Sequence, residues 1–299
     1  MSDRAPVAGK LTVPLLTKLT VPVLTMTALV AGASAGVAPV EAQSWRTVTM
    51  SRQLTDQARM DVDLSFGAGS FNVRPAEEGL LYRIEMRYDE ELYEPEVEYE
   101  GDRLDVDIDR GSGGFPFGRD HSAGSLDLGL SRDVVLELDL RFGAVRADLE
   151  LGGLAISEMA LATGASESTL RVSEPNPESM RWARIEAGAA RFEAHSLGNL
   201  NAERIEVDAG LGEMSLGFDG EWRRDVTVEI DMGMGSLDLE FPRGLGVRLE
   251  MDSFLASVDP QGLIKDGDSY VSPDWEDAEH RVTLEVDAAL GRVGVSWNP

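Results

Sequence analysis

The sequence has no cysteine among its 299 residues. A disulfide framework, a thiolate metal site and a cysteine nucleophile are therefore excluded. Lysine is confined to Lys10, Lys18 and Lys265, and the formal net charge is −27 with a pI near 4.4. Because a nucleic-acid-binding protein needs clustered Lys and Arg to neutralise phosphates, this composition argues against a nucleic-acid partner.

Histidine is scarce as well. His121, His195 and His280 lie far apart in the sequence and show no metal-ligand spacing. After residue 42 the chain also lacks a G-x-S-x-G elbow, a phosphate-binding loop and a His-Glu helix motif. We therefore predict no cofactor and no catalytic residue, and do not expect an enzyme.

Long apolar runs are missing after residue 42. Before it, Arg4, Lys10 and Lys18 precede an apolar run over residues 19–30 and then small residues, which is typical of a signal peptide. We predict a signal peptide over residues 1–42, cleaved after Ala42, or alternatively after Ala35. An uncleaved segment over residues 19–38 is just long enough to span a bilayer and would be the one membrane contact. The protein is expected to be exported, to the periplasm, the cell surface or the medium.

A strand pattern interrupted by glycine dominates the rest of the chain. Residues 226–242 read VTVEIDMGMGSLDLEFP, in which apolar and polar residues alternate on both sides of Gly233 and Gly235. This period of two indicates β-strands. The two apolar sets lie in opposite numerical phase, so the glycine segment must bend to turn both toward one core.

The pattern recurs along the chain, with Gly233 as the reference for an anchor position. The equivalent positions are Gly67, Gly143, Gly164, Gly188, Gly210, Phe254 and Ala289. Most intervals are 21–24 residues, and the column three residues before the anchor is apolar in every unit. Such a period is the signature of stacked units that are each too small to bury their own apolar face.

Two longer intervals break the repeat. We predict a lead-in segment over residues 43–59 and a repeat domain over residues 60–299. Insertions are expected at about residues 80–124, with a hairpin and a glycine-rich loop, and at 261–280. Insertions in stacked repeats emerge as loops, often on the binding face. The final strand, with Val293, Val295 and Trp297, is expected to close the stack, where a terminal unit needs a cap against edge pairing.

The repeat predicts an all-β fold. If the units stack in parallel, identical columns lie about 4.8 Å apart and the chain forms a single-stranded β-solenoid, or β-helix, of about 21–24-residue repeats. The alternative is an antiparallel β-meander or barrel of hairpins that turn at the glycine segments. Constant period and column identity favour the solenoid.

Units such as VDAGLGEMSLGF and IDMGMGSLDLEFP, following an export signal, resemble the bacterial toast-rack or adhesin-domain family, which has LiaF-like relatives. The resemblance covers roughly residues 60–297. It implies a right-handed β-solenoid and a non-enzymatic, adhesin-like or cell-envelope interaction protein. The alternatives are a solenoid polysaccharide lyase or hydrolase and an envelope-stress signalling accessory. LiaF-like proteins usually carry several membrane helices, whereas this chain has one short apolar segment.

Two acidic columns are the feature of the repeat that points to binding. Two residues before the anchor stand Glu186, Asp208, Asp231, Asp252 and Asp287, and four before it stand Glu206, Glu229, Glu250 and Glu285. Stacked about 4.8 Å apart in water, adjacent carboxylates repel by roughly 0.9 kcal/mol. We expect an acidic face that is screened by cations, Ca²⁺ among them, or by flanking Arg204 and Arg248, with a simple solvated surface as the alternative.

The second insertion mixes carboxylates with aromatic rings that suit a sugar or a protein partner. Its candidate ligand-binding residues are Asp266, Asp268, Tyr270, Asp274 and Trp275. A packed capping loop is the alternative. The expected partner is an envelope protein or a cell-surface glycan.

Overall fold

The structure is a computed structural model that describes residues 44–110 and 124–298. The strands described here all belong to one compact unit, Gln43–Pro299. The predicted signal peptide and most of the glycine-rich loop with His121 lie outside the described residues. Within those residues, no helix is long and apolar enough to cross a membrane.

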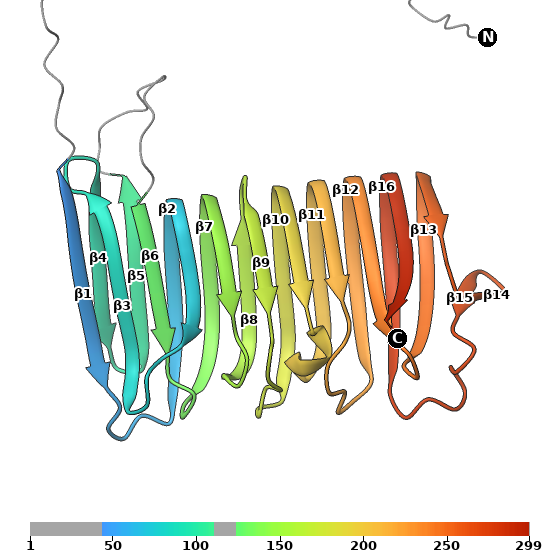
Figure 1. Cartoon of the computed structure of the whole chain (residues 1–299), viewed down its shortest axis with the longest axis horizontal. Coiled ribbons are helices and arrows are strands. Elements are labelled where there is room, and N and C mark those ends of the chain that lie inside the picture. Colours follow the sequence, from blue (N-terminus) through green and yellow to red (C-terminus); the bar gives the residue numbers. More distant parts are fainter. Residues whose placement is uncertain (1–43, 111–123, 299) are drawn as a thin grey trace, which may run out of the picture. The chain divides into compact units, whose positions relative to one another are not determined.

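The protein is all-β: in the described residues, sixteen strands belong to one sheet, and one short 3₁₀ helix, η1 (Leu197–Leu200), joins two of them (Figure 1). In chain order the strands are β1 (Trp45–Gln53), β2 (Arg59–Pro75), β3 (Leu80–Asp89), β4 (Tyr93–Glu100), β5 (Arg103–Arg110), β6 (Gly124–Leu130), β7 (Val135–Glu150), β8 (Ala155–Thr163), β9 (Glu167–Arg171), β10 (Met180–His195), β11 (Ala202–Gly217), β12 (Val226–Pro242), β13 (Gly246–Asp259), β14 (Ile264–Asp266), β15 (Ser269–Val271) and β16 (Arg281–Asn298).

The repeat strands pair in parallel and in the register of the sequence columns. Ile230 of β12 lies opposite Val207 of β11 on one side and Val286 of β16 on the other. Parallel pairing also joins β2 to β7, β7 to β8, and β8 to β10. The antiparallel alternative is therefore wrong for these strands, because their apolar columns stack directly on one another.

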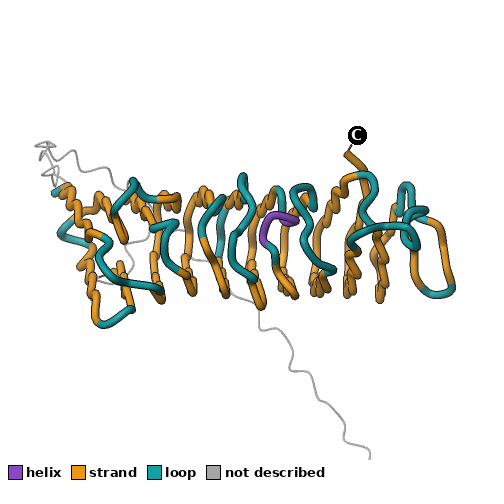
Figure 2. The backbone as a smooth tube through the Cα atoms, turned by 90° about the horizontal axis from the view of Figure 1, so that it is seen from below, coloured by secondary structure: helices purple, strands orange, loops and turns teal. Residues whose placement is uncertain are grey.

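Each long repeat strand bends at its anchor segment, which contains glycine in β2, β7, β10, β11, β12 and β16 but not in β13. Val228 and Ile230 before the bend and Leu237 and Leu239 after it are all buried in one hydrophobic core, so both apolar sets do face the same interior. Figure 1 shows the strands turning over at the upper edge, so that two walls enclose the core, and Figure 2 shows the stack from below.

Close approach of neighbouring backbones explains the glycines. A Cβ on Gly233 would lie 2.5 Å from the carbonyl oxygen of Gly210 in the next strand. Gly235, two residues further on, has a φ of +148°, and a Cβ there would overlap the carbonyl oxygen of Gly212. Glycine tolerates both conditions because it has no side chain.

The connections on the other edge are held by buried asparagines. Asn176 accepts a hydrogen bond from the backbone N of Ile156 and donates to the carbonyl oxygens of Ile156 and Leu200. Asn199 donates to the carbonyl oxygen of Val172, one unit below. These side chains satisfy backbone groups that leave the strand ladder at the turns.

The order of the last strands differs from the expected one. β16 ends the chain but lies between β12 and β13, so Val293 and Val295 are interior and do not close the stack. After β13, the long connection over residues 260–280 carries the chain back, so that β16 takes the position between β12 and β13. β13 is covered by β15 over Arg248–Glu250, and that short antiparallel pair is part of the second insertion.

The first insertion builds the opposite end of the sheet. β3, β5 and β6 pair with β1, β2 or one another, and β4 pairs antiparallel with β5. The hairpin expected in this insertion is confirmed: β4 and β5 pair antiparallel across the turn between Glu100 and Arg103. β3 and β6 add two further strands to the same end of the sheet. β1 lies within the predicted lead-in and forms the outermost strand at this end (Figure 1).

Candidate functional site: an acidic groove

The two acidic columns become continuous rows across four neighbouring strands. Asp208 of β11, Asp231 of β12, Asp287 of β16 and Asp252 of β13 lie opposite one another in that order. Glu206, Glu229, Glu285 and Glu250 form the second row in the same register. We call these two rows the acidic ladders. Their side chains lie outside the wall, because the residues between them, such as Ile230, are buried.

The β14–β15 hairpin turns part of the acidic ladders into a groove. Asp268, in the turn of this hairpin, and Ser269 line a cavity of about 570 Å³ together with ladder residues of three strands. Its carboxylates are Glu229, Asp231, Glu250, Asp252, Asp268, Glu285 and Asp287. We call this cavity the acidic groove. Ile230 and Val286 also border the cavity, but their side chains are buried in the core, so the side chains that face it are mainly carboxylates.

Arginine compensates one end of the acidic ladders. Arg184 on β10 lies 2.7 Å from Glu206, and Arg204 on β11 lies 3.0 Å from Glu229. The hydrogen bond and the charge of Glu206 raise the pKa of Arg184 above its ordinary value. Arg204 thus flanks the ladder as expected, whereas the guanidinium of Arg248 lies 4.6 Å from the ring centroid of Trp275.

The other end of the acidic ladders carries uncompensated charge. Within residues 44–110 and 124–298, no ion pair involves Glu250, Asp252, Glu285 or Asp287, the carboxylates contributed by β13 and β16. Each adjacent pair of carboxylates at strand spacing repels by about 0.9 kcal/mol in water before screening. A cationic ligand in the acidic groove would relieve that repulsion.

The structure brings only one of the five insertion residues into the groove, and that residue is Asp268. Tyr270 packs against the core, opposite Leu249. Asp266 pairs with Ser269 within the hairpin, and the carbonyl oxygen of Asp274 accepts hydrogen bonds from the amides of Asp277 and Ala278. Trp275 lies against the guanidinium groups of two arginines. These contacts hold the segment against β13, and the ligand-binding role of the five residues stays a prediction.

Metal-binding geometry is a separate matter from negative charge. Among the described residues, no group of three or more His, Cys, Asp or Glu side chains is arranged to hold a metal ion. The carboxylates of a ladder project side by side from a flat wall, whereas Ca²⁺ needs six to eight oxygens that converge on one point. His195 approaches Glu193 at 3.8 Å, and His280 lies at the end of the second insertion.

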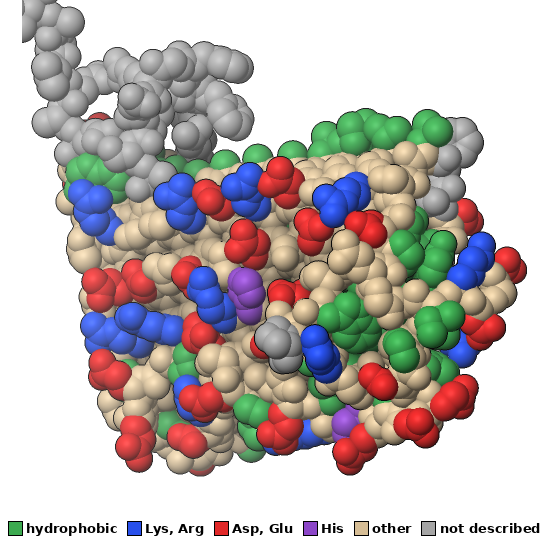
Figure 3. Space-filling view, turned by 45° about the vertical axis from the view of Figure 1, so that its right-hand side comes forward, with side chains coloured by type: hydrophobic (Ala, Val, Ile, Leu, Met, Phe, Trp, Pro, Cys, Tyr) green, Lys and Arg blue, Asp and Glu red, His purple; other side chains and the backbone are tan. Residues whose placement is uncertain are grey.

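One apolar feature beside the groove was not predicted from the sequence. Leu211, Met234, Leu290 and Leu255 each follow an anchor position directly, and their side chains are exposed. Figure 3 shows apolar side chains along the upper edge of the molecule, with acidic and basic side chains below them. The signal was present in the sequence as a column one residue after the anchor.

Comparison with known proteins identifies the family. The chain matches the family described as the N-terminal domain of toast_rack, DUF2154, over residues 39–195, just over half of its length. No curated protein matches it. Similar solved structures include a "putative cell adhesion protein" from Clostridium sporogenes, with 17% identity, a TM-score of 0.46 and coverage of 85% of this chain and 100% of that one. A "putative adhesin" from Bacteroides fragilis shows 8% identity, a TM-score of 0.32 and coverage of 84% and 97%. The chain belongs to the toast-rack family.

Proposed function

We propose that the protein is a non-enzymatic, exported, adhesin-like protein that binds another component of the cell envelope through its acidic groove. The observation that carries this proposal is the juxtaposition of seven carboxylates from three parallel strands and one hairpin around a single cavity. The groove is part of the rigid stack, so binding there needs little ordering of the protein.

Two further features support the proposal. The first 42 residues have the pattern of a signal peptide, which would deliver the chain to the envelope. The repeat strands pair in parallel and in register, which supports our proposal that the fold is a right-handed β-solenoid. Such a stack presents an extended side surface for contact with a partner.

The chemistry of the groove favours binding over catalysis. Arg184 and Arg204, the basic residues nearest to the ladders, form exposed ion pairs with Glu206 and Glu229. General acid–base catalysis needs two groups held in different environments on either side of a reacting bond. The ladder carboxylates instead repeat one environment from strand to strand.

Cosedimentation with isolated cell envelopes of the producing bacterium tests the proposal. The purified chain is compared with a groove variant, Asp231→Asn/Asp252→Asn/Asp287→Asn, and with a control variant that loses three exposed carboxylates from β4, Glu94→Gln/Glu96→Gln/Glu98→Gln. Both variants change the net charge equally.

We expect the groove variant to lose about tenfold in apparent affinity, which corresponds to about 1.4 kcal/mol, and the control variant to bind like the unmodified chain. Thermal melts check that both variants fold. Absence of envelope binding by the unmodified chain, or equal losses in the two variants, would overturn the proposal.

A further inference from the structure

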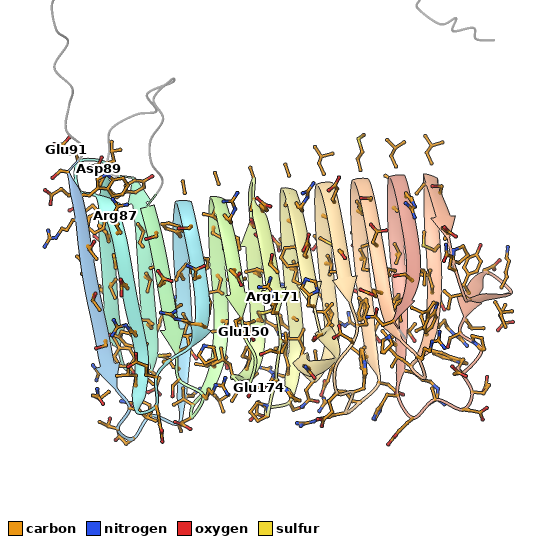
Figure 4. All side chains as sticks on the ribbon, in the orientation of Figure 1. Arg87, Asp89, Glu91, Glu150, Arg171 and Glu174 are labelled. Carbon is orange, nitrogen blue, oxygen red and sulfur yellow. The ribbon has the colours of Figure 1, made fainter. Side chains whose placement is uncertain are left out.

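A row of exposed apolar side chains runs along the bend of four neighbouring strands. Leu211, Met234, Leu290 and Leu255 are 54, 48, 38 and 64% exposed. Leu211 lies opposite Met234, Met234 opposite Leu290, and Leu290 opposite Leu255. We call these four residues the corner row. Figure 4 shows side chains that project beyond the upper turn of these strands.

The corner row occurs only where the acidic ladders are complete. The same column contains Ala68 on β2, Ala144 on β7 and Ala189 on β10, which precede the row in the stack. In those strands the ladder columns hold residues of mixed character, such as Ser65, Arg141 and Arg184. Large apolar residues and carboxylates at both ladder positions therefore appear together, on β11, β12, β16 and β13.

A trough separates the corner row from the aspartates of the acidic ladders. Along β11 and β12, the anchor glycine stands between the aspartate and the apolar residue of the row, so no side chain fills that position. Asp208, Asp231, Asp287, Gly210 and Gly233 line a cavity of about 340 Å³ there. A ligand in the trough would have apolar side chains on one side and carboxylates on the other.

We propose that the corner row and the adjoining aspartates dock a cationic amphipathic helix of a partner protein. This proposal rests on the function proposed above and specifies the partner's chemistry. The apolar stripe of the helix would cover the corner row, and its flanking Lys or Arg side chains would meet Asp208, Asp231, Asp252 and Asp287. Charge complementarity of this kind selects a basic partner.

The spacing of the row matches a helix better than an extended peptide. Neighbouring strands place the apolar side chains about 4.8 Å apart. A helix lying along the row would present successive turns about every 5.4 Å, whereas a strand would present same-face side chains about every 6.6 Å. The four side chains span about 14 Å, so a helix of roughly three turns would cover them.

Charge argues against two other occupants. A second copy of this chain would bring another set of acidic ladders toward the first, in a protein with a net charge of −27. A lipid bilayer that received the corner row would move the aspartates, three residues away on each strand, toward a less polar medium. Both occupants remain as distinct outcomes of the test.

The probe is a designed helix of about 18 leucine and lysine residues with one apolar stripe, and the control is a peptide of the same composition without a stripe. Affinity for the full chain is measured calorimetrically at about 0.1 M and about 1 M salt, where the Debye length is roughly 10 Å and 3 Å. The apolar variant is Met234→Ser/Leu290→Ser, and the charge variant is Asp231→Asn/Asp287→Asn. The matched control is Ala68→Ser/Ala144→Ser, in the same column.

We expect the striped peptide to bind at least about tenfold more tightly than its control, and the apolar variant to lose that advantage at both salt concentrations. The charge variant should lose affinity chiefly at low salt, and Ala68→Ser/Ala144→Ser should have no effect. Leu211→Ser/Leu255→Ser provides a second apolar variant if the first melts early.

Three results would overturn the inference. Equal binding of both peptides would show simple charge attraction. Binding to phosphatidylcholine vesicles that Met234→Ser/Leu290→Ser abolishes would assign the corner row to a lipid surface, and a dimer lost in the same variant would assign it to a second copy. If envelope binding still depends on the groove carboxylates in any of these cases, the proposed function stands and only the helical partner is wrong.

Discussion

At the scale of single residues, Ile230 and Glu229 are neighbours on β12 with opposite surroundings. Ile230 is 1% exposed in the core, whereas Glu229 lies on the groove face beside Arg204. Ile230→Asp should lower the free energy of unfolding by about 3–5 kcal/mol, because it buries an unpaired carboxyl group. Glu229→Ala should change it by less than about 1 kcal/mol. Denaturant unfolding of the two variants compares them, and equal effects would mean that the two faces are assigned wrongly.

Two tyrosines at the other end of the sheet predict an alkaline limit to stability. Burial raises the pKa of Tyr82 and of Tyr99 above the ordinary value of 10.0, although the charge of Arg52 opposes it. The guanidinium of Arg52 lies 4.2 Å from the ring centroid of Tyr99. In the unfolded chain these phenols ionise first, so the free energy of unfolding is unaffected below about pH 10 and falls as pH rises through the raised pKa.

The double variant Tyr82→Phe/Tyr99→Phe should flatten this fall. Urea unfolding between about pH 8 and pH 11 measures the slope for both proteins. Below about pH 9 the slopes should coincide, since neither phenol is ionised in either state. An identical fall in the variant above pH 10 would attribute the alkaline loss to other groups.

At the scale of the element, the bend of β12 depends on glycine for two separate reasons. Gly235 combines a positive φ with direct overlap between an added Cβ and the next strand. Gly235→Ala should therefore cost about 3 kcal/mol or more, because backbone strain and overlap add. Gly267, in the β14–β15 turn, has a φ of +62° but nothing within 4 Å of an added Cβ. Gly267→Ala should cost only about 1 kcal/mol. Thermal unfolding of both variants measures the two losses of stability. Equal losses would rule out the close approach of neighbouring backbones as the cause of the larger cost at Gly235.

At the scale of the whole molecule, charge is unevenly compensated. The net charge is −27, and the ladders on β13 and β16 have no arginine partner among the described residues. Salt should therefore raise the melting temperature by screening repulsion. Asp231→Asn/Asp287→Asn should raise the free energy of unfolding at low salt by about 1 kcal/mol and weaken its dependence on salt.

Calcium distinguishes screening from a fitted site. At equal ionic strength, CaCl₂ and NaCl should raise the melting temperature similarly, and calorimetric titration with Ca²⁺ should show no saturable heat, because ladder carboxylates do not converge on one point. A stoichiometric heat that disappears in Asp231→Asn/Asp287→Asn would establish a specific calcium site in the groove.

The sequence by itself determined the local structure of the repeat. Alternation over Val226–Pro242 predicts both strand halves, and the opposite phase of Ile230 and Leu237 predicts the bend between them. Equal spacing of the columns predicts parallel stacking and the two acidic ladders. These features depend on residues close together in the chain or on a regular repeat, so their signals are periodic and readable.

Only the tertiary structure decided how the ends of the stack are built. The apolar columns of β12, β13 and β16 are alike, so the sequence cannot tell which strand is the neighbour of which, and the connection over residues 260–280 permits either order. Placement of β16 inside the stack brings Glu285 and Asp287 between the other ladder residues, and the hairpin places Asp268 beside them. The acidic groove and the corner row exist because non-local strand pairing joins these segments, and no local pattern specifies that pairing.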